Sequence, residues 1–539
     1  MWILLCCILA NKMSWLKRLT RPGFRSYTLM LVALYLFLVF AFHSNLDPNY
    51  YGNGRSLEAD SNDAAIDSEK LELGSLAPKR LEGYDVIEGK ADRPEVRIDP
   101  DSRAARYLRE YGAKYVNPPV EHEFKRVNQR VMPSPSDELC FGTPMAETNT
   151  FTSVVPDLYV YSVFWDARYN DFDNTDAGVR LRIMTVIRTS LARSKPPIYC
   201  IFRNATHDWV PIKATFYEMC ENHGRPYGGF ILSCEVPQHI YGANKNISIC
   251  SVRLTSNDLP STGTAVHTFK VINTVAREKR HDFAICVAPL YGQLSHNQLI
   301  EFIELSSILG SSHVTFYDFN ISPDTLSLLE YYASIERVTI VPWRLSDYLD
   351  RSIWYHGQLV SILDCLYRNM ALTKYLAFND IDEYMMPYEH VDWNAMMTSL
   401  DSDNNCGYQF NSVFVDPNKQ AAVYDGPMTH KHLLTLTNTQ RTVSRSKIRT
   451  KCMLKPQLVF EAGIHHISKP IVAHLQTVRM DMPQALLHHH RVCQPNFGMN
   501  CQDFIDDRVV PSRYADVLIE RVNQTKHLFL ADSAPLENH

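Results

Sequence analysis

The hydrophobic and polar positions change their pattern three times along this chain of 539 residues. The first pattern is an uncharged apolar run over residues 27–42. As a helix this run spans roughly 24 Å, close to the ~30 Å of a bilayer core. Basic residues precede it, and the first acidic residue is Asp47. The positive-inside rule therefore predicts a cytosolic tail over 1–26, an uncleaved signal-anchor over 27–43 and a luminal remainder. A cleaved signal peptide and a buried core helix are the alternatives.

The second and third patterns divide the luminal part. Residues 44–150 are rich in Asp, Glu, Ser, Gly and Pro, and they predict a flexible stem. Beyond residue 150, short apolar runs alternate with helical ones. Strands are expected at 158–164, 197–202, 283–288, 313–317, 338–341 and 374–378, and helices at 299–309, 322–334 and 357–370. This alternation predicts an α/β domain over 151–510, with a mostly parallel sheet flanked by helices, and a C-terminal tail over 511–539.

Composition and charge narrow the classes of function. The chain is 45% hydrophobic and carries a net charge of −5 without a basic stripe, which argues against disorder and against nucleic acid as a partner. Eleven of the thirteen cysteines follow the expected anchor, so a luminal domain permits disulfides and leaves at least one thiol or an intermolecular bond. Four N-glycosylation sequons lie on the same side, at Asn204, Asn246, Asn320 and Asn523.

The strongest chemical signal follows the strand expected at 374–378. Asp380, Asp382 and Glu383 come directly after it. Ligands of α/β sheets bind beyond the carboxyl ends of strands, and repulsion among clustered carboxylates favours a neutralising divalent cation. An extended segment would place Asp380 and Asp382 on one side, as ligands for Mn²⁺ or Mg²⁺. The alternatives are a solvated acidic turn or a helix N-cap.

Several sequence blocks around this cluster carry a resemblance to a known family. Residues 354–358, 364–368 and 374–383 resemble the core of glycosyltransferase family 92, and blocks at 159–168, 301–318, 455–465 and 489–491 agree in order. The resemblance covers residues 155–500. It departs at His490, where the family usually has tyrosine.

The resemblance implies a fold and a reaction. It implies a GT-A-like, Rossmann-type fold, type II membrane topology, and a location in the Golgi or another secretory-pathway membrane. The implied reaction is inverting, depends on Mn²⁺ or Mg²⁺, and moves a hexose from a UDP-sugar to an N-glycan or other glycan. In the characterised type the hexose is galactose.

Roles for individual residues follow from the resemblance and the local chemistry. Asp382 is expected as the first metal ligand, with Asp380 on the ribose or on the metal through water. His489 and His465 are rival further ligands, because imidazole suits Mn²⁺. Glu461 is the leading candidate for the general base that deprotonates the acceptor hydroxyl.

Other residues have weaker assignments. Glu383 is a second candidate base. Arg491 is expected to hold the diphosphate, together with Lys447, Lys451 and Lys455 unless these lysines are solvated. Asp166 and Arg168 either face the donor nucleotide or form a structural ion pair. Trp354 and Tyr355 either stack on the donor or belong to the core.

Two further function classes stay open. One is a catalytically inactive luminal protein of the same fold that binds glycans. The other is a metal-dependent phosphoester hydrolase, which needs a second cluster of carboxylates and histidines that the sequence does not offer. No cysteine is expected to act beside a histidine.

Overall fold

The structure, a computed structural model, describes residues 150–168, 178–202, 211–241, 249, 251–256, 266–275, 279–419, 426, 428–495 and 499–532. The expected cytosolic tail, anchor and stem lie outside the described residues, apart from Thr150. The sequons at Asn204 and Asn246 also lie outside them. Within the described residues, no helix is both long and apolar enough to cross a membrane.

The first sheet occupies residues up to 275 and is mostly antiparallel. Among the described residues it has nine strands, in the order β5-β4-β8-β9-β2-β3-β7-β6 with β1 beside β2. The strands are β1 (Thr152–Val155), β2 (Leu158–Asp166), β3 (Val179–Arg188), β4 (Tyr199–Phe202), β5 (Ile212–Lys213), β6 (Thr215–Glu218), β7 (Tyr227–Val236), β8 (Ser251–Thr255) and β9 (His267–Asn273). Only the β2–β9 pair is parallel within this described sheet.

This first sheet departs from the α/β fold that the sequence predicts for the whole of 151–510. Parallel neighbours need a crossover of a dozen or more residues, usually a helix. In the described part of this region the α-helix is α4 (Thr189–Ser194), which has six residues. The strands therefore pair mainly as antiparallel neighbours, as in the long β3–β7 ladder from Val179↔Val236 to Arg188↔Tyr227.

The second sheet has ten strands in the described residues, in the order β11-β12-β10-β14-β18-β16-β22-β15, with β13 beside β12 and β21 beside β16. The strands are β10 (His281–Cys286), β11 (Leu290–Gly292), β12 (His313–Ile321), β13 (Val338–Pro342), β14 (Thr373–Phe378), β15 (Glu383–Pro387), β16 (Asn405–Phe414), β18 (Ser446–Leu454), β21 (Gln476–Met480) and β22 (Ala485–His489). Strands β10 to β14 pair in parallel, whereas β18 is antiparallel to both of its neighbours. The sheet is thus parallel in one half and mixed in the other.

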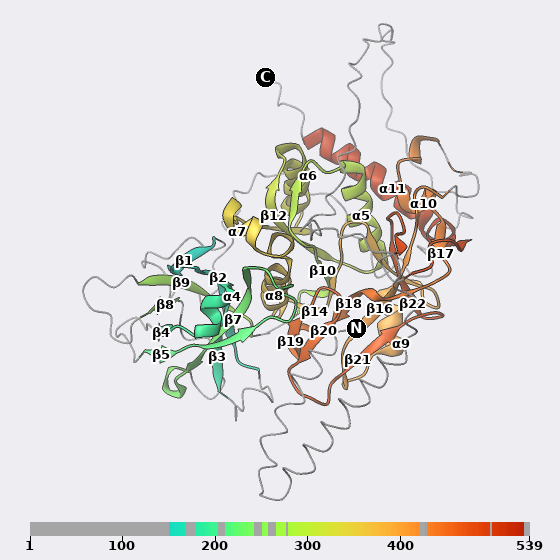
Figure 1. Ribbon diagram of the computed structural model, residues 1–539. Helices are drawn as coiled ribbons and strands as arrows, with labels where there is room; N and C mark the ends of the chain where they lie inside the picture. Colours follow the sequence, from blue (N-terminus) through green and yellow to red (C-terminus); the bar gives the residue numbers. More distant parts are fainter. Residues whose placement is uncertain are drawn as a thin grey trace, which may run out of the picture. The chain divides into compact units, whose positions relative to one another are not determined.

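The helices belong mainly to the second sheet (Figure 1). They are α5 (His296–Leu309), α6 (Pro323–Ser334), α7 (Asp347–Ser352), α8 (Gln358–Asn369), α9 (Trp393–Leu400), α10 (Leu434–Thr437) and α11 (Val509–Asp532). Two further sheets of two strands each pair β17 (Gln440–Thr442) with the sequence-distant β23 (Phe504–Asp506), and β19 (Val459–Ala462) with the next strand, β20 (Ile467–Pro470). Every strand and helix that the sequence predicted between 281 and 378 is confirmed, with bounds shifted by up to four residues.

Helix α8 lies between the two sheets (Figure 1). Its buried residues cover almost every face, from Gln358 to Tyr367 and Asn369. A helix buried all round needs partners on several sides. Here one apolar cluster joins Leu363 and Leu366 of α8 to Phe164 and Met184 of the first sheet and to Leu376 of the second.

The end of the chain also differs from the sequence prediction. Most of the expected tail over 511–539 is helix α11, whose residues Val510, Tyr514, Leu518 and Val522 are buried in the core of the second sheet. Arg513 donates hydrogen bonds to the carbonyl oxygens of Pro387, Tyr388 and His390. The four buried residues recur every four positions, which is the spacing of an amphipathic helix, so the signal was present in the sequence and the prediction missed it.

Candidate functional site

The acidic cluster lies where the sequence places it, at the carboxyl end of β14 in the middle of the second sheet. Strand β14 pairs in parallel with β10, with Phe378 opposite Cys286. A small, half-open pocket lies there. Its lining comes from the ends of β10 and β14, the first turns of α8, and two residues further along the chain: Cys286, Val287, Ala288, Gln358, Ser361, Ile362, Phe378, Asn379, Asp380, Lys451 and Ile464.

The backbone of the cluster is a turn and not the extended segment that the sequence predicts. The Glu383 N–H donates to the Asp380 carbonyl oxygen at 3.1 Å. The two aspartates consequently point to different partners. Asp380 Oδ2 lies 2.8 Å from Lys451 Nζ, whereas Asp382 Oδ2 lies 3.3 Å from His489 Nε2. Of the two, Asp380 lines the pocket.

Lys451 supplies part of the positive charge that the sequence assigned to a metal. Its side chain is 4% exposed, and its Nζ also lies 3.0 Å from Glu383 Oε2. Burial alone would lower the pKa of Lys451, but Asp380 and Glu383 raise it above its usual value. A lysine in this position stays charged and presents a fixed positive charge to the pocket wall.

Asp382 and His489 form a second pair, on β15 and β22. Burial alone would lower the pKa of His489, but Asp382 and Glu383 raise it. Burial would likewise raise the pKa of Asp382, and His489 lowers it. The His490 N–H donates to the Asp382 carbonyl oxygen at 2.8 Å, which fixes the register of the pair.

This pair has the geometry of two adjacent metal ligands. Two ligand atoms about 2.1 Å from one octahedral ion lie about 3 Å apart, close to the 3.3 Å between Asp382 Oδ2 and His489 Nε2. His489 Nδ1 has no hydrogen-bond partner, yet it lies 3.3 Å from Glu383 Oε1. A carboxylate behind a histidine in this way orients a metal-bound imidazole. The residues therefore fit a divalent cation.

The fit has a limit in the number of protein ligands. In the described part of the chain, no third Cys, His, Asp or Glu atom completes a compact group with Asp382 and His489. The remaining positions of an ion would be left to water and to substrate oxygens, as Mg²⁺-type ions allow.

His465, the rival ligand, is anchored elsewhere. Its Nδ1 lies 2.9 Å from the Thr450 carbonyl oxygen, as a protonated nitrogen that donates. Burial, reinforced by Lys451, lowers the pKa of His465 to about 3. The ring is therefore neutral. The charges of Lys451 and Asp380 both act on the pKa of His465, Lys451 lowering it and Asp380 raising it.

His490 departs from the family pattern and is buried. Neither of its ring nitrogens has a hydrogen-bond partner, and burial lowers its pKa to about 3. Its ring packs edge-on to Tyr384. The residue acts as an apolar wall beside the Asp382–His489 pair.

The turn that precedes α8 is strained, and it carries Tyr355. Tyr355, His356 and Gly357 all have positive φ, of 40°, 56° and 73°. Such values are costly for bulky residues and cluster at functional sites. The side chain of Tyr355 is 54% exposed, and Asp380 contributes to raising its pKa after burial. Trp354 instead packs on His223, so the two aromatic residues have different roles.

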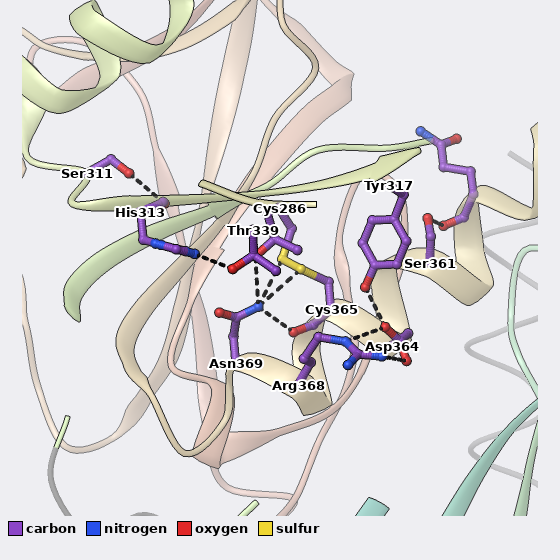
Figure 2. Close-up of a disulfide and its surroundings, with 12 residues drawn as sticks. Cys286, Ser311, His313, Tyr317, Thr339, Ser361, Asp364, Cys365, Arg368 and Asn369 are labelled. Atoms are coloured by element: carbon purple, nitrogen blue, oxygen red, sulfur yellow. Dashed lines mark hydrogen bonds and ion pairs between the residues drawn. A yellow bond between two sulfur atoms is a disulfide. The ribbon is translucent and has the colours of Figure 1, made fainter. Parts of the chain in front are cut away.

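A disulfide fastens α8 to the pocket floor. Cys286 at the end of β10 is bonded to Cys365 of α8 (Figure 2). The preceding residue, Asp364, pairs with Arg368 and accepts the Tyr317 hydroxyl at 2.6 Å. Helix α8 is therefore held rigidly against the carboxyl end of β10.

The candidate base Glu461 lies in β19, away from the lining of this pocket. Its oxygens accept the Tyr217 hydroxyl at 2.7 Å and the Cys220 N–H at 2.8 Å. Burial raises the pKa of Glu461 to about 7. These contacts are those of a residue that joins the first sheet to the β19–β20 hairpin.

Asp166 and Arg168 form the structural ion pair that the sequence left open. Asp166 accepts hydrogen bonds from the guanidinium groups of Arg168 and Arg182. Burial alone would raise the pKa of Asp166, but the two arginines hold it below the usual range. Arg168 also donates to the carbonyl oxygens of Pro456 and Val459. The network ties β2 to the segment before β19.

The remaining predicted residues lie outside the lining of the pocket. Arg491 is exposed just beyond β22, and its charge opposes the rise in the pKa of Tyr355. Lys455 pairs with Asp401, and Lys447 is exposed on β18. The two described sequon residues, Asn320 and Asn523, are exposed on β12 and α11, and the Asn523 amide contacts His430.

Sequence reasoning missed two arrangements that depend on distant strands. It did not place Glu383 behind His489, although both flank a strand end. It also did not foresee that Cys220 Sγ lies 3.7 Å from His466 Nε2, across 246 residues of sequence. The neighbouring histidines His488 and His489 in a strand were an available signal for the first arrangement. Successive strand residues face opposite sides of a sheet, so the two rings must have different partners.

Comparisons with known proteins identify a family for the second part of the chain. Residues 281–523 match the profile of glycosyltransferase family 92. Beta-1,4-galactosyltransferase galt-1 of Caenorhabditis elegans is 26% identical over 430 residues, which cover 78% of this chain and 91% of that protein. Galactan beta-1,4-galactosyltransferase GALS3 of Arabidopsis thaliana is 27% identical over 204 residues, 36% of this chain and 39% of its own.

Solved structures add little. The S. aureus TarS structure aligns with a TM-score of 0.22 and 11% identity over 39% of this chain and 60% of that one, a likeness too slight to carry an argument. The profile match spans the second sheet, the acidic turn and the Asp382–His489 pair. Residues 281–523 are a glycosyltransferase family 92 domain.

Proposed function

We propose that this chain transfers galactose from UDP-galactose to a hydroxyl group of a glycan, with inversion at the sugar. The observation that carries the proposal is the Asp382–His489 pair beside the acidic turn at the carboxyl end of β14. Its support is the relative galt-1, a β-1,4-galactosyltransferase by name, to which most of both chains aligns. The sugar and the glycan acceptor come from this likeness.

Groups in the pocket and in the adjoining Asp382–His489 pair are complementary to a nucleoside diphosphate. Asp382 and His489 would hold Mn²⁺ or Mg²⁺, which supplies a Lewis acid for the negative charge of the departing UDP. Residues of the first turns of α8 line the pocket, and helix N-termini favour phosphate. Lys451 holds Asp380 in place and adds a positive charge on the same wall.

The general base is not among these groups. Both oxygens of Glu461 are already hydrogen-bonded in a buried junction, and Glu383 is held by Lys451 and faces His489. The proposal therefore gives neither residue the role of base. Under it the acceptor side of the pocket supplies the base, opposite the leaving diphosphate.

The same proposal includes the cellular setting. The apolar run over 27–42, with basic residues before it, supports a type II anchor that places this domain in the lumen of the Golgi or a neighbouring compartment. Disulfides such as Cys286–Cys365 are in keeping with an oxidising compartment.

The test follows UDP release by the purified full-length chain. UDP-galactose and other UDP-sugars are supplied with a mixed N-glycan pool, with Mn²⁺ or with a chelator. The matched variants are Asp382→Asn and Asp403→Asn, the latter from another Asp-x-Asp of the chain, in an exposed turn. We expect metal-dependent release from UDP-galactose that falls about 100-fold or more in D382N and stays unchanged in D403N.

Two outcomes would contradict the proposal. Release from a different UDP-sugar would revise the donor. Silence with every donor, together with retained binding to immobilised glycans, would favour the inactive glycan-binding alternative.

A further inference from the structure

A second group of ligand-type side chains lies outside the pocket. Cys220 and Glu221 come from the loop between β6 and β7, and His466 comes from the bend between β19 and β20. One ligand atom from each of the three lies within 4.8 Å of the others, and this is the only such group in the described part of the chain. It joins the first sheet to the family 92 domain.

The potential ligand atoms of Cys220 and His466 lie close enough together to share one metal ion. Cys220 Sγ and His466 Nε2 lie 3.7 Å apart, and the Ser468 hydroxyl oxygen lies 3.0 Å from the sulfur and 3.1 Å from the nitrogen. A tetrahedral ion bound about 2.3 Å from sulfur and about 2.0 Å from nitrogen separates these ligands by roughly 3.6 Å. The observed spacing therefore matches a shared ion. Glu221 Oε1 lies 3.9 Å from His466 Nδ1.

The backbone around the group is fixed before any ion binds. Glu221 Oε2 accepts the Ile464 N–H at 2.5 Å, and the Cys220 N–H donates to Glu461. A Cβ at Gly463 would lie 2.6 Å from Glu221 Oε2, so a side chain there would displace the carboxylate from its present position. This preorganisation lowers the cost of bringing the three ligands together.

We propose that Cys220, Glu221 and His466 bind one zinc(II) ion that cross-links the β6–β7 loop to the β19–β20 hairpin. Thiolate, imidazole and carboxylate together are the ligand set of zinc, whereas Mn²⁺ and Mg²⁺ prefer oxygen. Binding releases the thiol proton to solvent, and water or the Ser468 hydroxyl takes the fourth position. The His466 side chain is 38% exposed, so the ion has a path from solvent.

The test measures metal directly. Full-length chain is stripped with a chelator and titrated with Zn²⁺ by calorimetry, and with Co²⁺ by absorption, where a thiolate ligand gives a charge-transfer band. Every variant also carries Asp382→Asn, which removes the site at the acidic turn. We expect one equivalent of Zn²⁺ bound, a cobalt–thiolate band, and a melting temperature raised by a few degrees.

The variants separate the site from other thiols. Cys220→Ser and His466→Gln should each lose the cobalt band and weaken Zn²⁺ binding about 100-fold or more. Cys406→Ser, a buried thiol on β16, should change neither. Zn²⁺ should also protect Cys220 from alkylation.

Three outcomes would overturn the proposal: no Zn²⁺ bound by the parent chain, a cobalt band that survives C220S, or alkylation of Cys220 that Zn²⁺ does not slow. The cluster would then be a hydrogen-bonded cysteine–histidine pair. The result is independent of the transferase proposal, because D382N removes transfer and is expected to keep this ion.

Discussion

At the scale of residues, the acidic turn is organised by charge pairing within the protein. Lys451 lies between Asp380 and Glu383, and His489 lies between Asp382 and Glu383. Glu383 thus belongs to both pairs and is 2% exposed. It aligns the cation of the pocket wall and the imidazole of the candidate metal site at the same time.

Replacement of Glu383 should therefore weaken the metal site without removing a ligand. In Glu383→Gln, His489 loses the carboxylate behind its Nδ1, and such losses typically cost about 10- to 100-fold in metal affinity. We expect the Mn²⁺ concentration that gives half-maximal transfer to rise by about that factor. The matched control is Glu389→Gln, an exposed glutamate in the turn after β15. An unchanged Mn²⁺ dependence in E383Q would show that Glu383 does not orient His489.

The sequence predicted the strand and the carboxylates of this turn, but not the residues that contact them. Strand 374–378 and the carboxylates after it follow from local pattern. The partners do not, because Lys451 and His489 reach the turn from β18 and β22, and the register of those strands is set by burial far from the site. The expectation of an extended Asp-x-Asp segment was wrong for a local reason, since one hydrogen bond from the Glu383 N–H to the Asp380 carbonyl oxygen makes it a turn.

At the scale of elements, α11 is the part of the fold that the sequence prediction missed. Its inner face packs on α5 and α10, and its outer face is polar. Leu518 is fully buried in this packing, whereas Leu530, further along the same helix, is 67% exposed. The helix is therefore an integral layer of the family 92 domain.

Two leucines of α11 provide a matched test of this layer. Leu518→Ala should lower the free energy of unfolding by about 2–5 kcal/mol, because it leaves a cavity in the core. Leu530→Ala should change it by less than about 0.5 kcal/mol. Urea unfolding followed by tryptophan fluorescence measures both. Equal effects of the two substitutions would place α11 outside the cooperative core.

At the scale of the whole molecule, buried carboxyl groups link the sheets to pH. Burial raises the pKa of both Glu301 and Glu461 to about 7. A raised folded-state pKa means that the folded chain holds the proton more tightly than the unfolded chain. Each group therefore contributes stability that is fully present below about pH 4.5, and this contribution is lost as the pH rises towards 7.

Glu461→Gln should remove one of these contributions to the pH dependence. Gln does not ionise, so we expect the stability of the variant relative to the parent to improve by about 2–3 kcal/mol from pH 5 to pH 8. The exposed Glu330→Gln should show no such change. Thermal or urea unfolding at several pH values allows the comparison, and a constant difference between E461Q and the parent would contradict the assignment. If E461Q instead folded normally but lost transfer by about 100-fold or more, Glu461 would return to the role of general base.

The α/β prediction succeeded where helices separate strands and failed where they do not. Between 281 and 378 the parallel strands alternate with helices long enough to return the chain to the same edge of the sheet. Before 281, the apolar runs at 158–164 and 197–202 were recognised as strands, but their partners β3 and β8 were not. The pairing of such strands depends on contacts across the sheet, which one sequence does not reveal.

Helix α8 has an implication for how such proteins can diverge. Its core residues touch both sheets, and Ser162 of β2 donates to Asp364 at 2.5 Å. The first sheet therefore cannot be exchanged between relatives as an independent cassette. If residues 150–275 were replaced by those of another member, the new sheet would pack poorly on α8 unless the residues of α8 that contact it were replaced as well. Descent should thus have kept these two segments together, although Ser162 and its partner are 202 residues apart in the chain.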